Sequence, residues 1–240
     1  MTASTSQNSA SVPATRRARL RQQTLDEIKS LARQQLAASG TGGLSLRGIS
    51  RQMGMAPAAL FRYFDTQSAL ITALCIDAFH ELADAMAQAK LNAGADSQLS
   101  VRAVGAAYRA WALSHPGDFA LVAGTPIPDY HAEPSDTGPA AVRPILIFGA
   151  AYLDAVGTGA AGPAVTELGP VAASPLLLEL AHESTADPVI TAVVLNAWSS
   201  LTGFLTSEIF GSLGQLVMDV DALFNDHLTT VMRGMGFPAA

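Results

Sequence analysis

Apolar residues recur along this chain every three or four positions, which is the spacing of amphipathic helices rather than of strands. The first such run predicts a helix over residues 16–38, and the glycine-rich stretch at 39–43 ends it. The apolar face of this helix is formed by Leu25, Ile28, Leu31, Ala32 and Leu36. Because strand-like alternation is scarce in the rest of the chain, the sequence predicts an all-α protein.

The segment 44–64 has the pattern of two short helices joined by a tight turn. Ser45 is placed to cap a helix that begins at about Leu46, and Gly54 supplies the turn that ends it. Pro57 sits in the first turn of the next helix, where its missing N–H has no cost. The side chains spaced to pack these helices at a steep angle are Ile49, Met53, Met55, Leu60 and Tyr63. This pattern predicts a helix-turn-helix, whose second helix lies in the DNA major groove.

Beyond this motif the periodicity predicts a long helix followed by a larger helical bundle. The expected helices are 68–91, 99–114, 116–122, 140–156, 175–182, 187–212 and 219–234. The proline-rich stretch 125–139 and the glycine-rich stretch 157–174 are expected to be loops. The last two helices carry apolar positions that suit a two-fold, four-helix interface: Val189, Val193, Ala197, Leu201, Leu223, Leu228 and Val231.

Charge is segregated along the chain. Residues 1–64 hold nine basic and two acidic residues, a net charge of +7, whereas the whole chain carries −6 and the remainder therefore −13. A basic end is attracted to phosphate, and an acidic remainder keeps the rest of the molecule off the duplex. The charge pattern therefore supports DNA binding through the first quarter of the chain.

Other features argue against membrane, metal and enzyme functions. The 20 residues of 188–207 carry no charge, but they contain polar side chains and lack flanking basic anchors, which favours a buried helix over a membrane span. Residues 1–15 are polar and lack a secretory segment, so a disordered arm and a cytoplasmic protein are expected. No familiar hydrolase, nucleotide or metalloprotease motif is present, the five histidines are scattered, and the single cysteine is Cys75. We therefore expect no catalysis, no metal and no cofactor.

Residues 20–75 resemble the TetR family of transcriptional regulators. The family's signature positions correspond to Leu44, Ile49, Gly54, Leu60, Phe61, Tyr63, Phe64 and Leu70. The segments YRAWALSHPGDFALVAG and AWSSLTGF resemble a WHG-like branch with a tryptophan in its penultimate helix, where Thr202 replaces a common histidine. The resemblance implies an all-α homodimer that represses transcription by binding a palindromic operator and releases it when a small molecule binds.

The resemblance places DNA contacts at Ser45, Arg47, Ala56, Pro57, Ala58, Phe61, Arg62 and Tyr63. Arg47 should reach phosphate, whereas Arg62 could read guanine or clamp phosphate. Pro57 and Ala58 cannot make bidentate base contacts, so DNA shape gains weight in recognition. Phe61 and Tyr63 could instead pack against the first helix. The arm arginines could enter the minor groove or follow phosphates: Arg16, Arg17, Arg19 and Arg21.

These expectations divide the chain into an arm at 1–15, a three-helix DNA-binding domain at 16–66 and a ligand-binding and dimerisation domain at 67–240. A small, mostly apolar effector would contact Met86, Tyr108, Trp111, His115, Phe148, Tyr152 and Trp198. Two alternatives remain open at this point. One is an architectural DNA-binding dimer without a ligand, and the other is a helical interaction module whose turn motif is incidental.

Overall fold

The structure is a computed structural model that describes residues 15–123, 127, 130–164, 168–181, 186–211 and 213–238. The described part contains ten α-helices and no strand, as the all-α prediction requires. Most of the expected arm, residues 1–14, lies outside the described residues. Thr15 caps the first helix, since its hydroxyl accepts a hydrogen bond from the backbone N–H of Ala18 at 3.2 Å.

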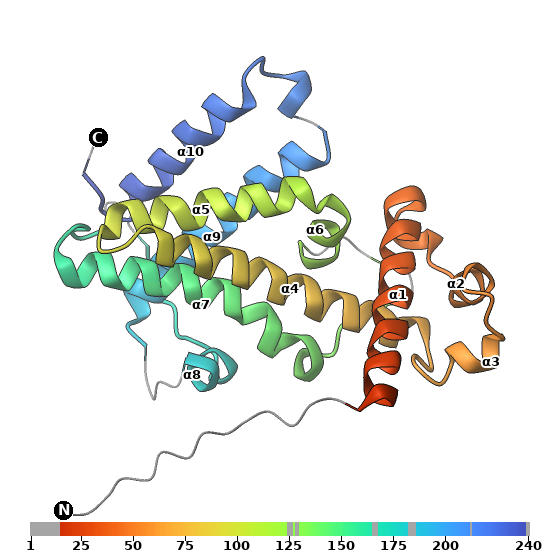
Figure 1. The fold of residues 1–240 in the computed structure, drawn as a ribbon. Helices are drawn as coiled ribbons and strands as arrows, with labels where there is room; N and C mark the ends of the chain where they lie inside the picture. The colour runs from red at the N-terminus through yellow and green to blue at the C-terminus, as the bar shows by residue number, and fades with distance from the viewer. Residues whose placement is uncertain are drawn as a thin grey trace, which may run out of the picture.

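The first three helices form a separate head at one end of the molecule (Figure 1). They are α1 (Arg16–Ser39), α2 (Leu46–Gln52) and α3 (Pro57–Leu60). Ile28, Ile49 and Leu60 are fully buried in the core that these helices share. The predicted cap is confirmed, because the Ser45 hydroxyl accepts a hydrogen bond from the N–H of Gly48 at 3.1 Å. The predicted turn is confirmed as well, with Gly54 at φ 64°.

A long helix, α4 (Gln67–Asn92), leaves the head and runs into the body (Figure 1). It packs along α5 (Ser97–Ser114) and α7 (Pro134–Thr158), while α6 (Pro116–Val122) lies near the head and touches α1. The body is completed by α8 (Pro175–Ala181), α9 (Pro188–Ile209) and α10 (Val220–Gly234). The long connecting helix therefore belongs to both cores: Leu70, Ile71, Leu74 and Cys75 are buried in the head core, and Ala78, Leu82 and Met86 in the body core.

The start of α7 differs from the prediction, which placed a loop over 125–139. The helix begins at Pro134 and continues through Pro139 and Pro144. Pro134 occupies the first turn, where its missing N–H has no cost. The two internal prolines each remove one backbone hydrogen bond, and burial of Thr137, Ala140 and Pro144 outweighs that loss. Proline content alone therefore predicted too long a loop.

Two helices are long and apolar enough to cross a membrane, namely α7 and α9. Length and composition are weak grounds, since core helices of soluble proteins meet the same test. In α9 the side chains of Val193, Ala197, Leu201 and Leu205 are buried in the body core. The uncharged run is thus explained by packing within the fold.

The same burial removes four of the seven residues predicted for the dimer face. Val193, Ala197, Leu201 and Leu228 are each 3% exposed or less, because they pack in the core of their own protomer. These four cannot also contact a second copy, whereas Val189 is exposed and Leu223 and Val231 are half-buried, so these three stay accessible in the protomer. The periodicity identified a buried face correctly, but it could not tell whether that face is covered from within the chain or by a partner.

The chain end is fixed in the body by a glycine that the sequence does not single out. Gly236 has φ 96°, and its carbonyl accepts a hydrogen bond from the N–H of Gly162 at 2.9 Å. A β-carbon at this position would collide with the carbonyl oxygens of Gly162 and Pro163. Its neighbours Met235 and Phe237 are buried.

Replacing Gly236 with alanine should therefore lower the free energy of unfolding by about 2–4 kcal/mol, from the left-handed backbone and the backbone collision together. Urea unfolding measures the change. Gly117→Ala is the matched control, since nothing lies within 4 Å of the added methyl group. A Gly236→Ala protein as stable as Gly117→Ala would contradict this account of the chain end.

Candidate DNA interface and body

The exposed surface of the helix-turn-helix contains most of the predicted DNA contacts. Ala56 caps α3 without a side-chain hydrogen bond, and Pro57 and Ala58 follow it on an exposed helical turn. Arg47 is exposed at the start of α2, and Phe61 is 41% exposed just after α3. Ser45 is half-buried, and its hydroxyl is already used as the cap of α2. Its contribution to this surface is therefore mainly to hold α2.

The first turns of α1 and the end of α3 together form a basic groove of about 680 Å³. Arg62, on the turn after α3, faces this groove with Arg16, Arg17 and Arg21 from α1. The remaining lining is Leu20, Thr24, Met55, Ala59 and Tyr63. Four arginines along one groove make a surface that attracts a phosphate backbone. Sequence reasoning treated α1 and the turn motif as separate sources of charge and did not predict the groove.

Tyr63 joins the two sides of this groove. Its ring is half-buried and packs against the head core, while the guanidinium carbon of Arg21 lies 5.2 Å from the ring centroid. An arginine over an aromatic face gains a cation–π attraction that restricts its side chain. Of the two roles considered for Tyr63, the structure shows packing against the head core, and the residue also lines the groove.

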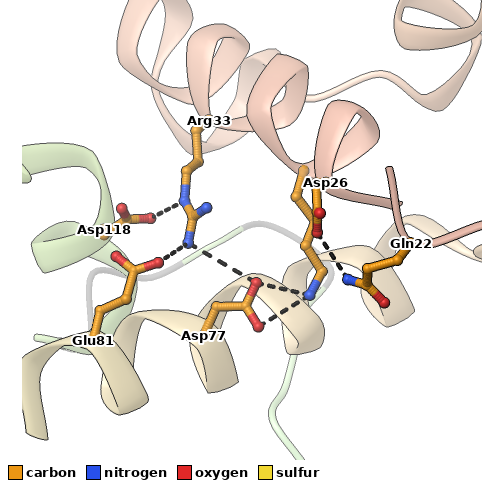
Figure 2. Close-up of polar contacts among 7 residues, drawn as sticks. Gln22, Asp26, Arg33, Asp77, Glu81 and Asp118 are labelled. Atoms are coloured by element: carbon orange, nitrogen blue, oxygen red, sulfur yellow. Dashed lines mark hydrogen bonds and ion pairs between the residues drawn. The ribbon is translucent and has the colours of Figure 1, made fainter. Parts of the chain in front are cut away.

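Two of the nine basic residues counted in the head face the body instead of the DNA surface. Arg33 of α1 donates from Nε to Asp118 of α6 at 3.0 Å and from Nη2 to Glu81 of α4 at 3.1 Å (Figure 2). Lys29 pairs with Asp77 of α4 at 2.7 Å. We call these five residues the head–body joint. The +7 charge therefore overstates what the head offers to DNA.

Asp118 is the buried carboxylate of the head–body joint, so the joint depends on the charge of Arg33. Its side chain is only 7% exposed, and it is placed in the first turn of α6 by the chain turn at Pro116. Burial alone would lower the pKa of Arg33, but the hydrogen bond and charge of Asp118 outweigh this and the pKa lies above its usual value. The guanidinium thus remains charged and compensates the buried carboxylate.

We expect Arg33→Met to lower the free energy of unfolding by about 1–3 kcal/mol, because Asp118 would keep a buried charge without its main partner. Adding Asp118→Asn to that variant should restore part of the loss. Urea unfolding of both single variants and the double variant gives the coupling. Lys90→Met is the control, since it breaks the more exposed pair of Lys90 with Asp154 and should cost about 1 kcal/mol or less. Equal losses for Arg33→Met and Lys90→Met would refute the special role of the joint.

In the body, three of the predicted effector contacts come together. Tyr108 of α5 stacks on Trp198 of α9 with ring centroids 4.6 Å apart, and Phe148 of α7 lies 6.4 Å from the same indole ring. The hydroxyl groups of Tyr108 and Thr202 are 3.1 Å apart. Burial raises the pKa of Tyr108 to about 12, so its phenol is neutral at physiological pH. This cluster is closely packed.

The other predicted effector contacts lie in different places. Met86 is fully buried on α4, and the Tyr152 hydroxyl donates to the carbonyl of Met235 at 2.9 Å near the chain end. Trp111 stacks on the exposed ring of His115 at the junction of α5 and α6. The buried indole Nε1 of Trp111 has no hydrogen-bond partner within the described residues. Six of the seven side chains thus belong to or pack against one buried body core, and His115 lies at its edge.

Arg109 of α5 is held by ion pairs within the body. Its guanidinium makes a bidentate salt bridge with Glu208, in which Nε donates to Oε2 at 2.9 Å and Nη2 donates to Oε1 at 2.5 Å. The same guanidinium reaches Asp221 at 2.6 Å and lies over the ring of Phe224. These contacts tie α5 to α9 and α10, so the role of Arg109 is to hold the body together.

Comparison with known proteins identifies both parts of the chain. Residues 28–74 match the model of the bacterial regulatory proteins of the tetR family, and residues 101–231 match a tetracyclin repressor-like C-terminal domain. The chain is 33% identical over 213 residues to an HTH-type transcriptional regulator of Mycobacterium tuberculosis, covering 85% of this chain and 89% of that protein. A regulator of Mycobacterium bovis matches to the same extent.

Solved structures show the same fold. The regulatory protein SCO4313 superposes with a TM-score of 0.71 at 30% identity, covering 91% of this chain and 99% of that one. A protein with unknown function from Rhodococcus sp. RHA1 superposes with a TM-score of 0.68 at 23% identity, covering 88% and 95%. The likeness therefore extends over the head and the body.

Proposed function

The chain belongs to the TetR family of bacterial transcriptional regulators, and on that premise we propose that it is a cytoplasmic repressor with a palindromic operator. It would bind this operator as a homodimer and release it when a small, mostly apolar molecule binds the body. The observation that carries the proposal is the four-arginine groove beside the recognition turn, which suits a phosphate backbone. No catalytic step is assigned to it.

Phosphate contacts and DNA shape would supply much of the recognition. Arg62 is the side chain with the best position to leave the groove and reach a base edge, because it follows the exposed turn of α3. Ala56, Pro57 and Ala58 offer small apolar surfaces that suit a thymine methyl group. Arg16, Arg17 and Arg21 would follow the phosphates of the same strand.

The homodimer would use the outward face of α9, beside the residues of the predicted interface that stay accessible in the protomer. Asn196, Ser199 and Gly203 recur at helical spacing and are exposed in the protomer. Small side chains allow two helices to approach closely. Next to them, α9 and α10 enclose a groove of about 200 Å³ with His227 and Val231 on its wall. A partner helix seated there would bring the two α9 helices together.

Release of the operator requires that effector binding in the body changes the position of the head. The head–body joint supports this proposal, because Arg33 connects the head to both α4 and α6. An effector that shifts α6 or α4 would turn the head, and a two-fold protein reads half-sites about 34–36 Å apart. The effector acts only if it binds the released arrangement better than the DNA-bound one.

The effector contacts predicted from the sequence have a different role in this proposal. Met86, Tyr108 and Phe148 are at most 2% exposed, so an effector could reach them only by opening a packed core. They are then the side chains that an effector displaces when it binds nearby. His115 is exposed at the α5–α6 junction, so a change there would be passed directly to α6.

The proposal is tested by selecting fragments of genomic DNA with the purified protein and comparing their affinity with that of random duplexes. We expect selected fragments to share an inverted repeat and to bind about 10³-fold more tightly at physiological salt, with affinity falling steeply as salt rises. Strong, salt-dependent binding without any preferred sequence would support the architectural alternative. Absence of binding to any duplex would support the helical interaction module.

A further inference from the structure

A cavity of about 510 Å³ is lined by residues of α7, α8 and α9 and of the segment that leads into α9. These helices belong to the body, on the side away from the head (Figure 1). This volume is within the range of about 300–1,000 Å³ that small-molecule sites occupy. The walls are almost entirely aliphatic, and include Leu146, Leu153, Leu177, Leu180, Ile190 and Val194. It is thus separate from the aromatic cluster that the sequence suggested as the effector site.

Helix α8 lies over this cavity and forms one of its walls. It is seven residues long, and none of its side chains is buried. Leu177, Leu178 and Leu180 are only half-buried because the cavity lies beneath them. Leucines on so short a helix gain little from packing until this space is filled. A bound apolar chain would bury them and hold α8 against the body.

The polar groups at the cavity select against an anion. The described lining contains one charged residue, Asp187, whose carboxylate accepts hydrogen bonds from the N–H groups of Val189 and Ile190 at 2.7 and 3.1 Å. The Thr191 hydroxyl donates to the carbonyl of Asp187 at 2.8 Å. Both groups are therefore engaged within α9. A ligand carboxylate would meet a negative charge and, along the described lining, no cation.

One wall leads to the aromatic cluster. Val194 lines the cavity and also belongs to the body core that contains Phe148 and Trp198. We propose that this cavity binds an uncharged aliphatic chain, and, resting on the proposed function, that this molecule is the effector. Filling the cavity moves the Val194 wall, which passes the change to α7 and α9.

The chemical class is tested by calorimetric titration of the full-length protein with 1-hexanol, 1-octanol and 1-decanol. Affinity should rise about fourfold per added methylene, as expected for transfer of each group from water to an apolar wall. Decanoate should bind about tenfold more weakly than 1-decanol. Asp187→Asn keeps the helix cap and removes the charge, so it should narrow that difference. Decanoate that binds wild-type protein as tightly as 1-decanol would overturn the assigned class.

The location is tested with Ala150→Trp, which places an indole in the cavity from an exposed position on α7. This variant should lose 1-decanol binding, whereas Ala106→Trp, at an exposed position on α5, should retain it. Circular dichroism checks that both fold. Decanol binding that survives Ala150→Trp overturns the site. A changed oligomeric state together with unchanged decanol binding would instead identify the groove as an interface between copies.

Operator release is measured separately with the same alcohols. Release by 1-decanol from wild-type protein, but not from Ala150→Trp, is the result that supports the effector role. Decanol binding without release would refute that role and leave the site standing. Failure of the unliganded protein to bind any selected operator would refute the proposed function, independently of the cavity.

Discussion

Replacing Arg62 with alanine should lower affinity for the selected operator about 5- to 150-fold, equivalent to about 1–3 kcal/mol. Arg62 stands where the basic groove meets the exposed turn of α3, so it is placed to contact both phosphate and base edges. If it reads a guanine, the variant should also lose its preference at one position of each half-site. Electrophoretic mobility shifts with single-base operator variants measure both effects.

Arg47→Ala provides the comparison. Arg47 is exposed on α2 outside the groove, and a phosphate contact there should weaken all duplexes alike and reduce the salt slope by about one. Lys90→Met, in the body, should leave DNA affinity unchanged. An Arg62→Ala protein with wild-type affinity and specificity would remove this residue from the DNA interface.

Replacing Gly203 with arginine should convert the proposed homodimer into a monomer and lower operator affinity about 100-fold or more, because binding at one half-site would no longer hold a second head at the other. Gly203 is exposed on the outward face of α9, and nothing lies within 4 Å of an added β-carbon. The protomer should therefore fold normally, since arginine is also the better helix former. Light scattering at micromolar concentration measures the mass.

Gly157→Arg is the matched control, because Gly157 is also exposed on a helix with nothing within 4 Å of its β-carbon, but lies on α7. It should stay dimeric. A Gly203→Arg protein that remains dimeric and keeps its operator affinity would show that the copies meet elsewhere.

The local signals of the helix-turn-helix were sufficient to predict it from sequence. A serine cap, a glycine turn and a proline at the first helical position each act within a few residues, and all three occur as expected. Helix bounds in the body followed the periodicity closely, as in Pro116–Val122. The main exception is the start of α7, where tertiary packing outweighs the local effect of Pro139 and Pro144.

Contacts between distant segments were the part that sequence could not supply. Nothing in the local pattern of α1 distinguishes Arg33, which faces Asp118, from Arg21, which faces the basic groove. Counting charge therefore predicted the right end of the molecule but assigned too many cations to DNA. The basic groove itself also requires knowledge of how α1 crosses α3.

The same limit applies to the body. Aromatic residues such as Phe148 were predicted to surround an effector because they are large and apolar, but these are also the residues that fill a core. The cavity between α7, α8 and α9 is lined by aliphatic side chains from three separate segments. No spacing along the chain indicates that these side chains leave a space between them.

Sequence-specific DNA binding by a two-fold dimer depends on the spacing of the two half-sites, so we would change that spacing in the selected operator. Inserting about 5 base pairs between the half-sites moves one of them to the opposite side of the duplex, about half a helical turn away. Affinity of a two-fold dimer for the altered duplex should fall about 100-fold or more, to the level of a single half-site. Equal affinity for the original and altered duplexes at physiological salt would contradict it.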